Sequence, residues 1–143
     1  MNSFNDVSAL KVISCPYYPM QAGNVKVNKV TGIFVVLYAE CDDNGVVIPQ
    51  NVVALKVTTS RPYTGMFVQV NDSTQLTLNG VKSEFSFRRE SFILGSHLNT
   101  LPASNCTVLG ELSIQDSTKV LSMVSNFYGK VVEQSCNSLV KKA

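Results

Sequence analysis

The sequence predicts a mainly β protein, a small antiparallel β-barrel of about six to seven strands followed by one or two C-terminal α-helices. Two observations predict this fold class. Up to position 100, short β-prone runs alternate with turn signals about every ten residues. From position 101 onward, apolar residues fall mostly three or four apart, which is the period of an α-helix. We therefore expect a single domain over residues 1–143, with the β-barrel at 2–100 and a helical segment at 101–143.

The composition is that of a folded globular chain. Of the 143 residues, 45% are hydrophobic and 15% are charged, which excludes an intrinsically disordered protein. No apolar run approaches the roughly 20 residues of a membrane span, and the first residues lack the features of a signal peptide. The net charge of +2 is too small to indicate a nucleic-acid partner by itself, and it does not exclude one.

The expected strands lie between turn residues. Proline and glycine predict a loop over residues 15–24, and Asn-Gly pairs predict tight hairpin turns at 44–45 and 79–80. Gly32 is expected to interrupt the strand pattern. The β-prone runs are residues 9–13, 25–30, 33–39, 46–48, 51–59, 66–70, 75–78 and 81–94.

The last third carries the helical pattern. Its apolar positions are Leu109, Leu112, Val120, Val124, Phe127, Val131 and Leu139. A helix of this length must bury its apolar face, either on the chain's own sheet or against a second copy. Beyond residue 115 the pattern predicts an additional amphipathic helix, with Asp116 or Ser117 as its N-cap.

Motifs for catalysis and for metal or cofactor binding are missing from the sequence. It has no G-x-S-x-G, P-loop, H-E-x-x-H or dinucleotide-binding motif. Its four cysteines form no C-x-x-C pair, and none lies near the single histidine, His97, so we expect free thiols and no zinc. Asp42 and Asp43 fit a hairpin turn better than a metal site. We expect no catalytic residue, no metal and no cofactor.

Cations and aromatic residues are interleaved along the predicted strands. The cations are Lys11, Lys26, Lys29, Lys56, Lys82, Arg88 and Arg89, and the rings are Tyr38, Tyr63, Phe67, Phe85 and Phe87. Cations that bind phosphate and rings that stack on bases are how single-stranded nucleic acid is commonly held. The same residues also fit an apolar core with a solvated basic face, and the residue chemistry leaves both interpretations open.

Three stretches of the sequence match a known family. They are NSFNDVSALKVISC at 2–15, GIFVVLYAECD at 32–42, and the succession FILG, LNTL and VLGEL at 92–95, 98–101 and 108–112. In this order they resemble the coronavirus non-structural protein nine family, the single-stranded-RNA-binding subunit of the replicase. Residues 43–89 match only in hydrophobic pattern.

The resemblance implies a small barrel followed by one helix, and a role in viral RNA replication. Such a protein is a polyprotein product that binds single-stranded RNA, forms a homodimer through its C-terminal helix and joins the viral polymerase complex in the host cytoplasm. The family's N-terminal asparagine accepts a nucleotide or RNA in a step proposed for capping, and Asn2 is the matching residue. We expect RNA to bind Lys11, Lys26, Lys29, Lys82, Arg88 and Arg89.

The sequence also departs from the family pattern. The family's helix has a G-x-x-x-G motif for close dimer contact, and here Cys106 replaces the first glycine while Gly110 keeps the second. We expect Cys106, Leu109 and Gly110 to form the dimer interface. The family's usual Trp is missing, four extra residues precede Cys106, and the chain continues well beyond the expected helix. These differences indicate a divergent nidovirus member.

A small viral coat or assembly protein is the alternative function, because it can have the same order of strands and helices. Size in solution separates the two, since a coat subunit assembles into particles and a replicase subunit stops at dimers. An enzyme is disfavoured because no pair of nucleophile and base is recognisable.

Overall fold

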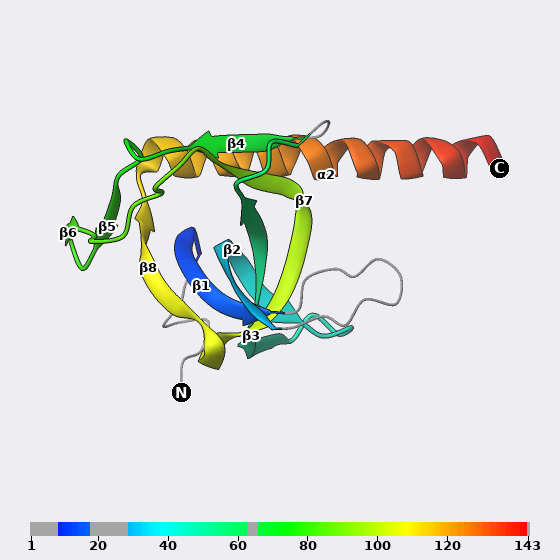
Figure 1. The fold of residues 1–143 in the computed structure, drawn as a ribbon. Helices are drawn as coiled ribbons and strands as arrows, with labels where there is room; N and C mark the ends of the chain where they lie inside the picture. Colours follow the sequence, from blue (N-terminus) through cyan, green and yellow to red (C-terminus); the bar gives the residue numbers. More distant parts are fainter. Residues whose placement is uncertain (1–8, 18–28, 63–65, 143) are drawn as a thin grey trace.

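The computed structural model describes residues 9–17, 29–62 and 66–142, and within them eight strands form one antiparallel sheet that curls into a half-barrel (Figure 1). The strand order is β4-β7-β3-β2-β1-β8-β5-β6. The strands are β1 (Lys11–Tyr17), β2 (Val30–Cys41), β3 (Val47–Thr58), β4 (Phe67–Val70), β5 (Leu76–Leu78), β6 (Val81–Lys82), β7 (Ser91–Pro102) and β8 (Thr107–Leu112). A 3-10 turn, η1 (Ala103–Asn105), joins β7 to β8, and the helix α2 (Ile114–Lys142) follows. The predicted fold class is confirmed, with eight strands where about six to seven were expected.

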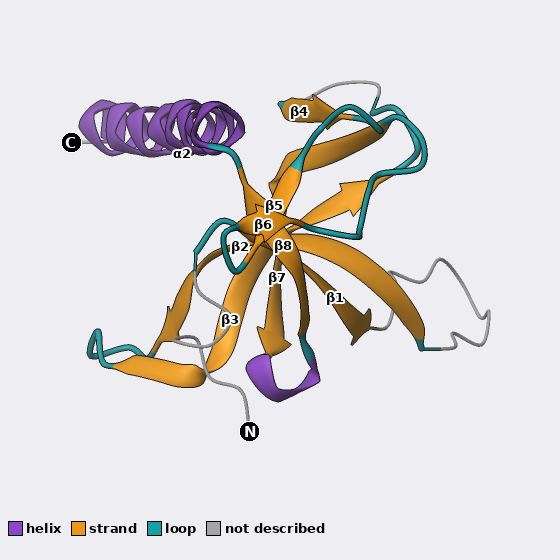
Figure 2. Cartoon of the chain, turned by 90° about the vertical axis from the view of Figure 1, so that its left-hand side faces the viewer, coloured by secondary structure: helices purple, strands orange, loops and turns teal. Residues whose placement is uncertain are grey.

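The sheet carries an apolar core on each face. Neighbouring residues of a strand point to opposite faces, so Val35 joins one core cluster while Phe34 joins the other. The helix α2 covers the face of Val35, where Val120 and Met123 are buried against the sheet. It contacts β4, β7 and β8, and its C-terminal part extends beyond the sheet (Figures 1 and 2).

Both hairpins that the Asn-Gly pairs predicted are present. Asp42 N–H donates to the Val46 carbonyl oxygen at 2.9 Å, and the Asp42 carboxylate accepts from the N–H groups of Asn44 and Val46. The aspartate is therefore a turn residue, as expected. At the second hairpin, Asn79 and Gly80 have φ values of 53° and 82°, which the tight turn between β5 and β6 requires.

Two interruptions expected near the N-terminus do not occur. Pro16 lies inside β1, because beyond Ser14 this strand pairs with β2 alone among the described residues and a residue without an N–H is tolerated there. Gly32 lies inside β2, where the Tyr17 ring packs over it. A Cβ on Gly32 would lie 2.5 Å from Tyr17 Cε1, so a close contact and not a turn explains this glycine. The strand expected at 25–30 falls largely outside the described residues.

The expected strand at 81–94 is wrong. It divides into β6, an irregular segment at residues 83–90, and the start of β7. The alternation that suggested one strand comes from Phe85, Phe87 and Phe92, and of these Phe87 and Phe92 are buried. Aromatic residues can reach a core from an irregular segment as well as from a strand, so their spacing did not reveal the break.

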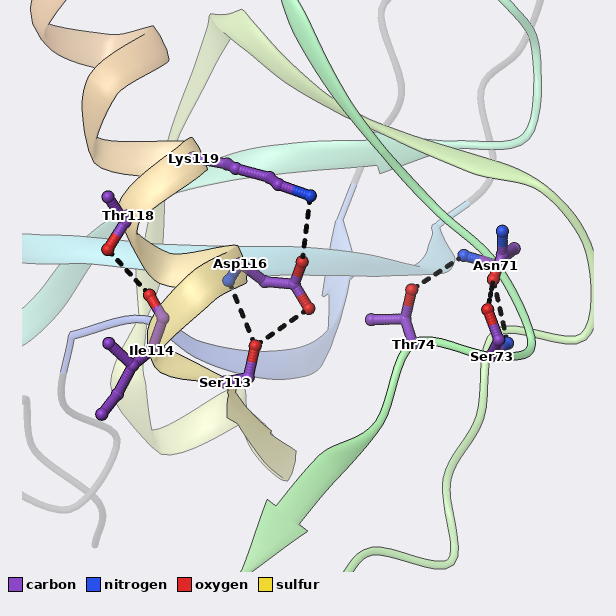
Figure 3. A network of polar contacts seen from close by, with 8 residues as sticks. All are labelled: Asn71, Ser73, Thr74, Ser113, Ile114, Asp116, Thr118 and Lys119. Carbon is purple, nitrogen blue, oxygen red and sulfur yellow. Dashed lines mark hydrogen bonds and ion pairs between the residues drawn. The ribbon is translucent and has the colours of Figure 1, made fainter.

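The expected start of the helix at residue 101 is also wrong. Residues 101–112 are the end of β7, η1 and β8, and α2 begins at Ile114 with Ser113 as its N-cap (Figure 3). Ser113 Oγ accepts from the Asp116 N–H at 3.1 Å and donates to the Asp116 carboxylate at 3.1 Å. Neither predicted N-cap is therefore the cap itself, although Asp116 takes part in the capping contact.

A β-bulge in the pairing of β1 with β8 explains why the spacing of apolar residues predicted a helix over residues that form a strand. The pairing of β1 with β8 shifts register between Val12 and Ile13, so Leu109 falls between two paired positions of β8. Leu109 and Leu112 consequently pack on the same core cluster although they are three residues apart. Three-residue spacing inside a bulged strand resembles one turn of a helix.

The predicted dimer interface loses its structural basis. Cys106 lies between η1 and β8, and Leu109 and Gly110 lie within β8, so none of the three is on an α-helix. Cys106 is 3% exposed in the core on the Phe34 face, Gly110 is buried, and Leu109 packs on the other core. These residues contact their own chain and do not form a contact between two helices.

Within the described residues, no helix is both long and apolar enough to cross a membrane.

Candidate nucleic-acid interface

The irregular segment at residues 83–90 is anchored by one serine. Ser83 N–H donates to the Leu76 carbonyl oxygen at 2.9 Å, and Ser83 Oγ donates to the Leu109 carbonyl oxygen. The same hydroxyl oxygen accepts from the Phe85 N–H at 3.1 Å. Ser83 is only 8% exposed, so these bonds hold the start of the segment against β5 and β8.

Phe85 and Phe87 form an edge-to-face pair in this segment. Their ring centroids are 5.3 Å apart and the rings are nearly perpendicular, at 83°. Phe87 is 4% exposed and belongs to the core, as the alternative interpretation of the phenylalanines expected. Phe85 is half-buried and lines the surface beside it, so Phe85 is the ring of this pair that a base can reach.

Two adjoining hollows run along the segment and share Glu84 and Phe85. The larger has a volume of about 650 Å³ and is lined by Ile33, Thr59, Glu84, Phe85, Ser86, Phe87, Arg88, Arg89 and Ser91. The smaller has about 440 Å³ and is lined by Leu78, Asn79, Val81, Lys82, Ser83, Glu84, Phe85, Val108 and Leu109. The predicted cations Lys82, Arg88 and Arg89 are exposed, and each lines one of the two hollows that share Phe85. Glu84 lines both hollows, and its negative charge reduces the positive charge of the groove.

Lys11 lies on the same side of the sheet as Lys82. The strand register places Lys82 opposite Thr77, Thr77 opposite Glu111, and Glu111 opposite Lys11. Residues in one such row point to the same face, and three inter-strand spacings separate the two lysines by roughly 14 Å. Lys11 therefore extends the basic surface along the row, with Glu111 between the two cations.

The other predicted cations lie elsewhere or serve another purpose. Lys29 lines a different hollow, which shares no residue with the first two. The Lys56 ammonium is half-buried above the Tyr17 and Phe34 rings, and burial lowers the pKa of this amine. Lys26 and Asn2 are outside the described residues, so the roles predicted for them stay predictions.

Sequence reasoning missed Ser83 and Glu84. Both lie in the stretch that was expected to be a regular strand, where a serine and a glutamate would simply alternate with apolar neighbours. The serine is the anchor of the segment, and the glutamate lines both hollows. No local sequence signal marks either role, because each depends on contacts with strands far away in the chain.

The described part of the chain gives little support for a metal site or for catalysis by His97. No group of three or more His, Cys, Asp or Glu residues there is arranged to hold a metal ion. His97 is exposed, and its Nδ1 lies 3.2 Å from Ser96 Oγ without a hydrogen-bonded carboxylate among the described residues. A scan against models of known protein families finds no match, and neither does a search of curated protein sequences.

Proposed function

We propose that the chain is a single-stranded RNA-binding cofactor of a viral RNA replication or transcription complex in the host cytoplasm. One observation carries the RNA-binding part, namely two adjoining hollows that share Phe85 and are flanked by Lys82, Arg88 and Arg89. A base can stack on the ring while the cations bind the neighbouring phosphates. The viral replicase part rests on the resemblance of the stretches at 2–15, 32–42 and 92–112.

Binding at this groove should be weak, tolerant of sequence and sensitive to salt. Few cations are present and Glu84 opposes them, so each phosphate contact contributes a large share of the affinity. For single strands the logarithm of the affinity falls with the logarithm of the salt concentration, by about 0.7 for each phosphate contact. Fluorescence anisotropy with a labelled oligonucleotide over a range of salt concentrations measures this slope.

Two variants of the groove test the assignment. Arg88→Ala combined with Arg89→Ala should lower the salt slope by roughly 1.4, because two phosphate contacts are lost. Phe85→Leu should weaken binding by about tenfold, within the range of a lost base stack, while its apolar contact with the core is retained. Lys119→Ala is the control, since Lys119 is an exposed cation that lines neither hollow. An unchanged affinity and slope in the double arginine variant would disprove the proposed site.

A homodimer through the C-terminal helix belongs to the same proposal. We now place the contact between the two copies on α2 and not on the residues in and next to β8 that the sequence predicted. Ile114 and Leu121 are 87% and 51% exposed, and their spacing of seven places them on one side of the helix. Leu121→Glu should convert a dimer into a folded monomer in sedimentation experiments. Asn126→Glu, on a different side of the helix, should leave the dimer intact. Assembly into particles would instead support a coat protein.

The proposed contact with the viral polymerase includes Asn2 as nucleotide acceptor. An α-amine has a pKa near 8, so a usable neutral fraction exists at physiological pH. Mass spectrometry after incubation with the polymerase and a nucleoside triphosphate should show the nucleotide on protein that begins at Asn2. Equally fast labelling of protein that retains Met1 would argue against this acceptor.

A further inference from the structure

Two buried cysteines lie opposite each other where β1 meets β8 (Figure 1). The antiparallel register pairs Ser14 with Thr107, and one residue further it places Cys15 opposite Cys106, whose backbone is still extended, with φ −90° and ψ 136°. Both side chains belong to the same core cluster and are 0% and 3% exposed. Opposite residues of an antiparallel pair have Cα atoms about 4.5–5.5 Å apart, and a disulfide needs roughly 4.4–6.8 Å. The backbone spacing therefore suits a bond between the two sulfurs.

The two thiols are in contact and differ in acidity. Burial raises the pKa of both. The hydrogen bond between them lowers the pKa of Cys15 in part, as does the charge of Lys29, whereas the pKa of Cys106 rises to about 12. A hydrogen bond with these opposite effects has Cys106 as the donor to an ionised Cys15. Cys15 is therefore the sulfur that ionises first, and the thiolate is the form that attacks an oxidant.

A hollow of about 380 Å³ lies beside the pair. It is lined by Pro16, Tyr17, Lys29, Asn99, Thr100, Leu101, Pro102 and Asn105. Its wall therefore includes the residue that follows Cys15 and the residue that precedes Cys106. Cys15 Sγ lies 3.5 Å from the Pro16 carbonyl oxygen, and Cys106 Sγ lies 3.4 Å from the Pro102 carbonyl oxygen. Both sulfurs thus contact residues of this wall, and a local opening of it admits a molecule as small as hydrogen peroxide.

We propose that Cys15 and Cys106 are an oxidation site for hydrogen peroxide and close into a reversible disulfide between β1 and the start of β8. The Cys15 thiolate attacks one peroxide oxygen, the O–O bond breaks, and hydroxide leaves while Cys15 becomes a sulfenic acid. The Cys106 sulfur then attacks the Cys15 sulfur, so that the S–S bond forms, the S–O bond breaks and water leaves. In total the two thiols lose two protons and two electrons, and one peroxide becomes two waters. A dithiol reductant reverses the reaction by thiol–disulfide exchange.

Peptide mapping under non-reducing conditions tests the bond. The whole chain with Cys41→Ser and Cys136→Ser keeps the buried pair and lacks the exposed thiols. After peroxide treatment of the folded protein, we expect the peptides of Cys15 and Cys106 to be joined and the protein to be lighter by two hydrogens. The urea midpoint should rise relative to the reduced protein, because the bond closes a long loop of the unfolded chain. Dithiothreitol should restore both the thiols and the lower midpoint.

Two single variants of this protein separate the roles of the sulfurs. Cys106→Ala removes the thiol that consumes the sulfenic acid, so dimedone, which reacts with sulfenic acids, should label Cys15 after peroxide treatment. Cys15→Ala is the matched control and should show no more label than the protein with both thiols, because the pKa of the remaining Cys106 is high. Each change replaces one buried sulfur by an apolar methyl group, and circular dichroism verifies that each variant is folded.

Several results would overturn the oxidation site. One is a folded protein in which both buried thiols stay reduced under peroxide that oxidises Cys41 of the wild type. Another is oxidation of either sulfur to a sulfinic acid without joined peptides. Joined peptides that form only above the urea midpoint would assign the bond to the unfolded chain and also disprove the site. Equal dimedone labelling of the two alanine variants would disprove Cys15 as the attacking sulfur. None of these outcomes bears on the salt-dependent RNA test of the groove.

Discussion

Gly110 of β8 lies directly against Leu76 of β5, so that a Cβ on Gly110 would stand 2.7 Å from Leu76 Cβ. The same Cβ would be 3.3 Å from Ser83 Cβ. The glycine therefore permits the hairpin of β5 and β6 to pack closely on β8, and it also keeps the anchor of the segment at 83–90 in position. Gly110 therefore permits close packing between strands of one chain.

Gly110→Ala should destabilise the protein by about 1–3 kcal/mol, as overpacking of a core does. The backbone of Leu76 would have to move, because the side chain collides at its Cβ and not at a flexible end. Urea unfolding measures the free energy of unfolding. Gly129→Ala is the control, since among the described residues no atom outside the local helix backbone lies within 4 Å of a Cβ there, and alanine favours the helix.

Gly110→Glu extends this test to the question of the dimer. A charge forced into the contact with Leu76 and Ser83 should unfold the domain, since an unpaired buried charge costs several kcal/mol. Circular dichroism should show loss of structure. A folded monomer would instead support the original prediction that Gly110 lies in a contact between two copies.

Ser113→Ala should cost about 1 kcal/mol of stability, the usual effect of removing an N-cap. The variant loses both the bond to the Asp116 N–H and the bond to the Asp116 carboxylate (Figure 3). Thermal unfolding followed by helical circular dichroism is the measurement. Ser125→Ala, at an exposed position of α2, should be neutral or slightly stabilising. Equal stability of the two variants would contradict the capping role.

The thiols should fall into two reactivity classes. Cys41 and Cys136 are exposed, while Cys15 and Cys106 are buried beside one another. Burial, and then the neighbouring Cys15, raises the pKa of Cys106 from 9.0 to about 12. A thiol reagent should therefore modify two cysteines rapidly and two slowly in the native protein. Rapid modification of all four would contradict the buried pair.

The Cys106 thiol should also make stability depend on pH in the alkaline range. The pKa of this thiol is raised in the folded state. Its contribution to the free energy of unfolding is therefore complete below pH 9.0 and is lost as the pH rises toward about 12. The advantage of the wild type over Cys106→Ala should shrink in urea unfolding above pH 9.0. An advantage that stays constant would show that the folded state does not raise this pKa.

Lys56 should have the opposite dependence on pH. Burial lowers the pKa of its ammonium from 10.5, so the unfolded chain binds more protons, and stability rises with pH toward 10.5. Relative to Lys56→Met, the wild type should therefore become more stable as the pH increases through the window below 10.5. The urea midpoints of the two proteins at several pH values measure the difference. Parallel pH curves would mean that Lys56 is fully solvated.

The candidate groove could be predicted in part. Lys82, Arg88, Arg89 and Phe85 were recognised from the mixture of cations and rings, and the fold does bring them together. Lys29 was grouped with them, but it lines a separate hollow with Tyr17 and Asn99. Sequence spacing cannot show which hollow a side chain enters, because that depends on the curvature of the sheet and on where each strand ends.

Local sequence patterns were sufficient to predict the fold class, the two Asn-Gly hairpins and the presence of a long C-terminal helix. These features depend on local chemistry, such as positive φ at Asn79 and Gly80 and the apolar period of residues 120–127. Tertiary structure alone decided that residues 107–112 are a strand, because pairing with β1 and a bulge at Leu109 outweigh a period that resembles a helix. It also decided the role of Gly110, since the approach of Leu76 is a contact between residues distant in sequence.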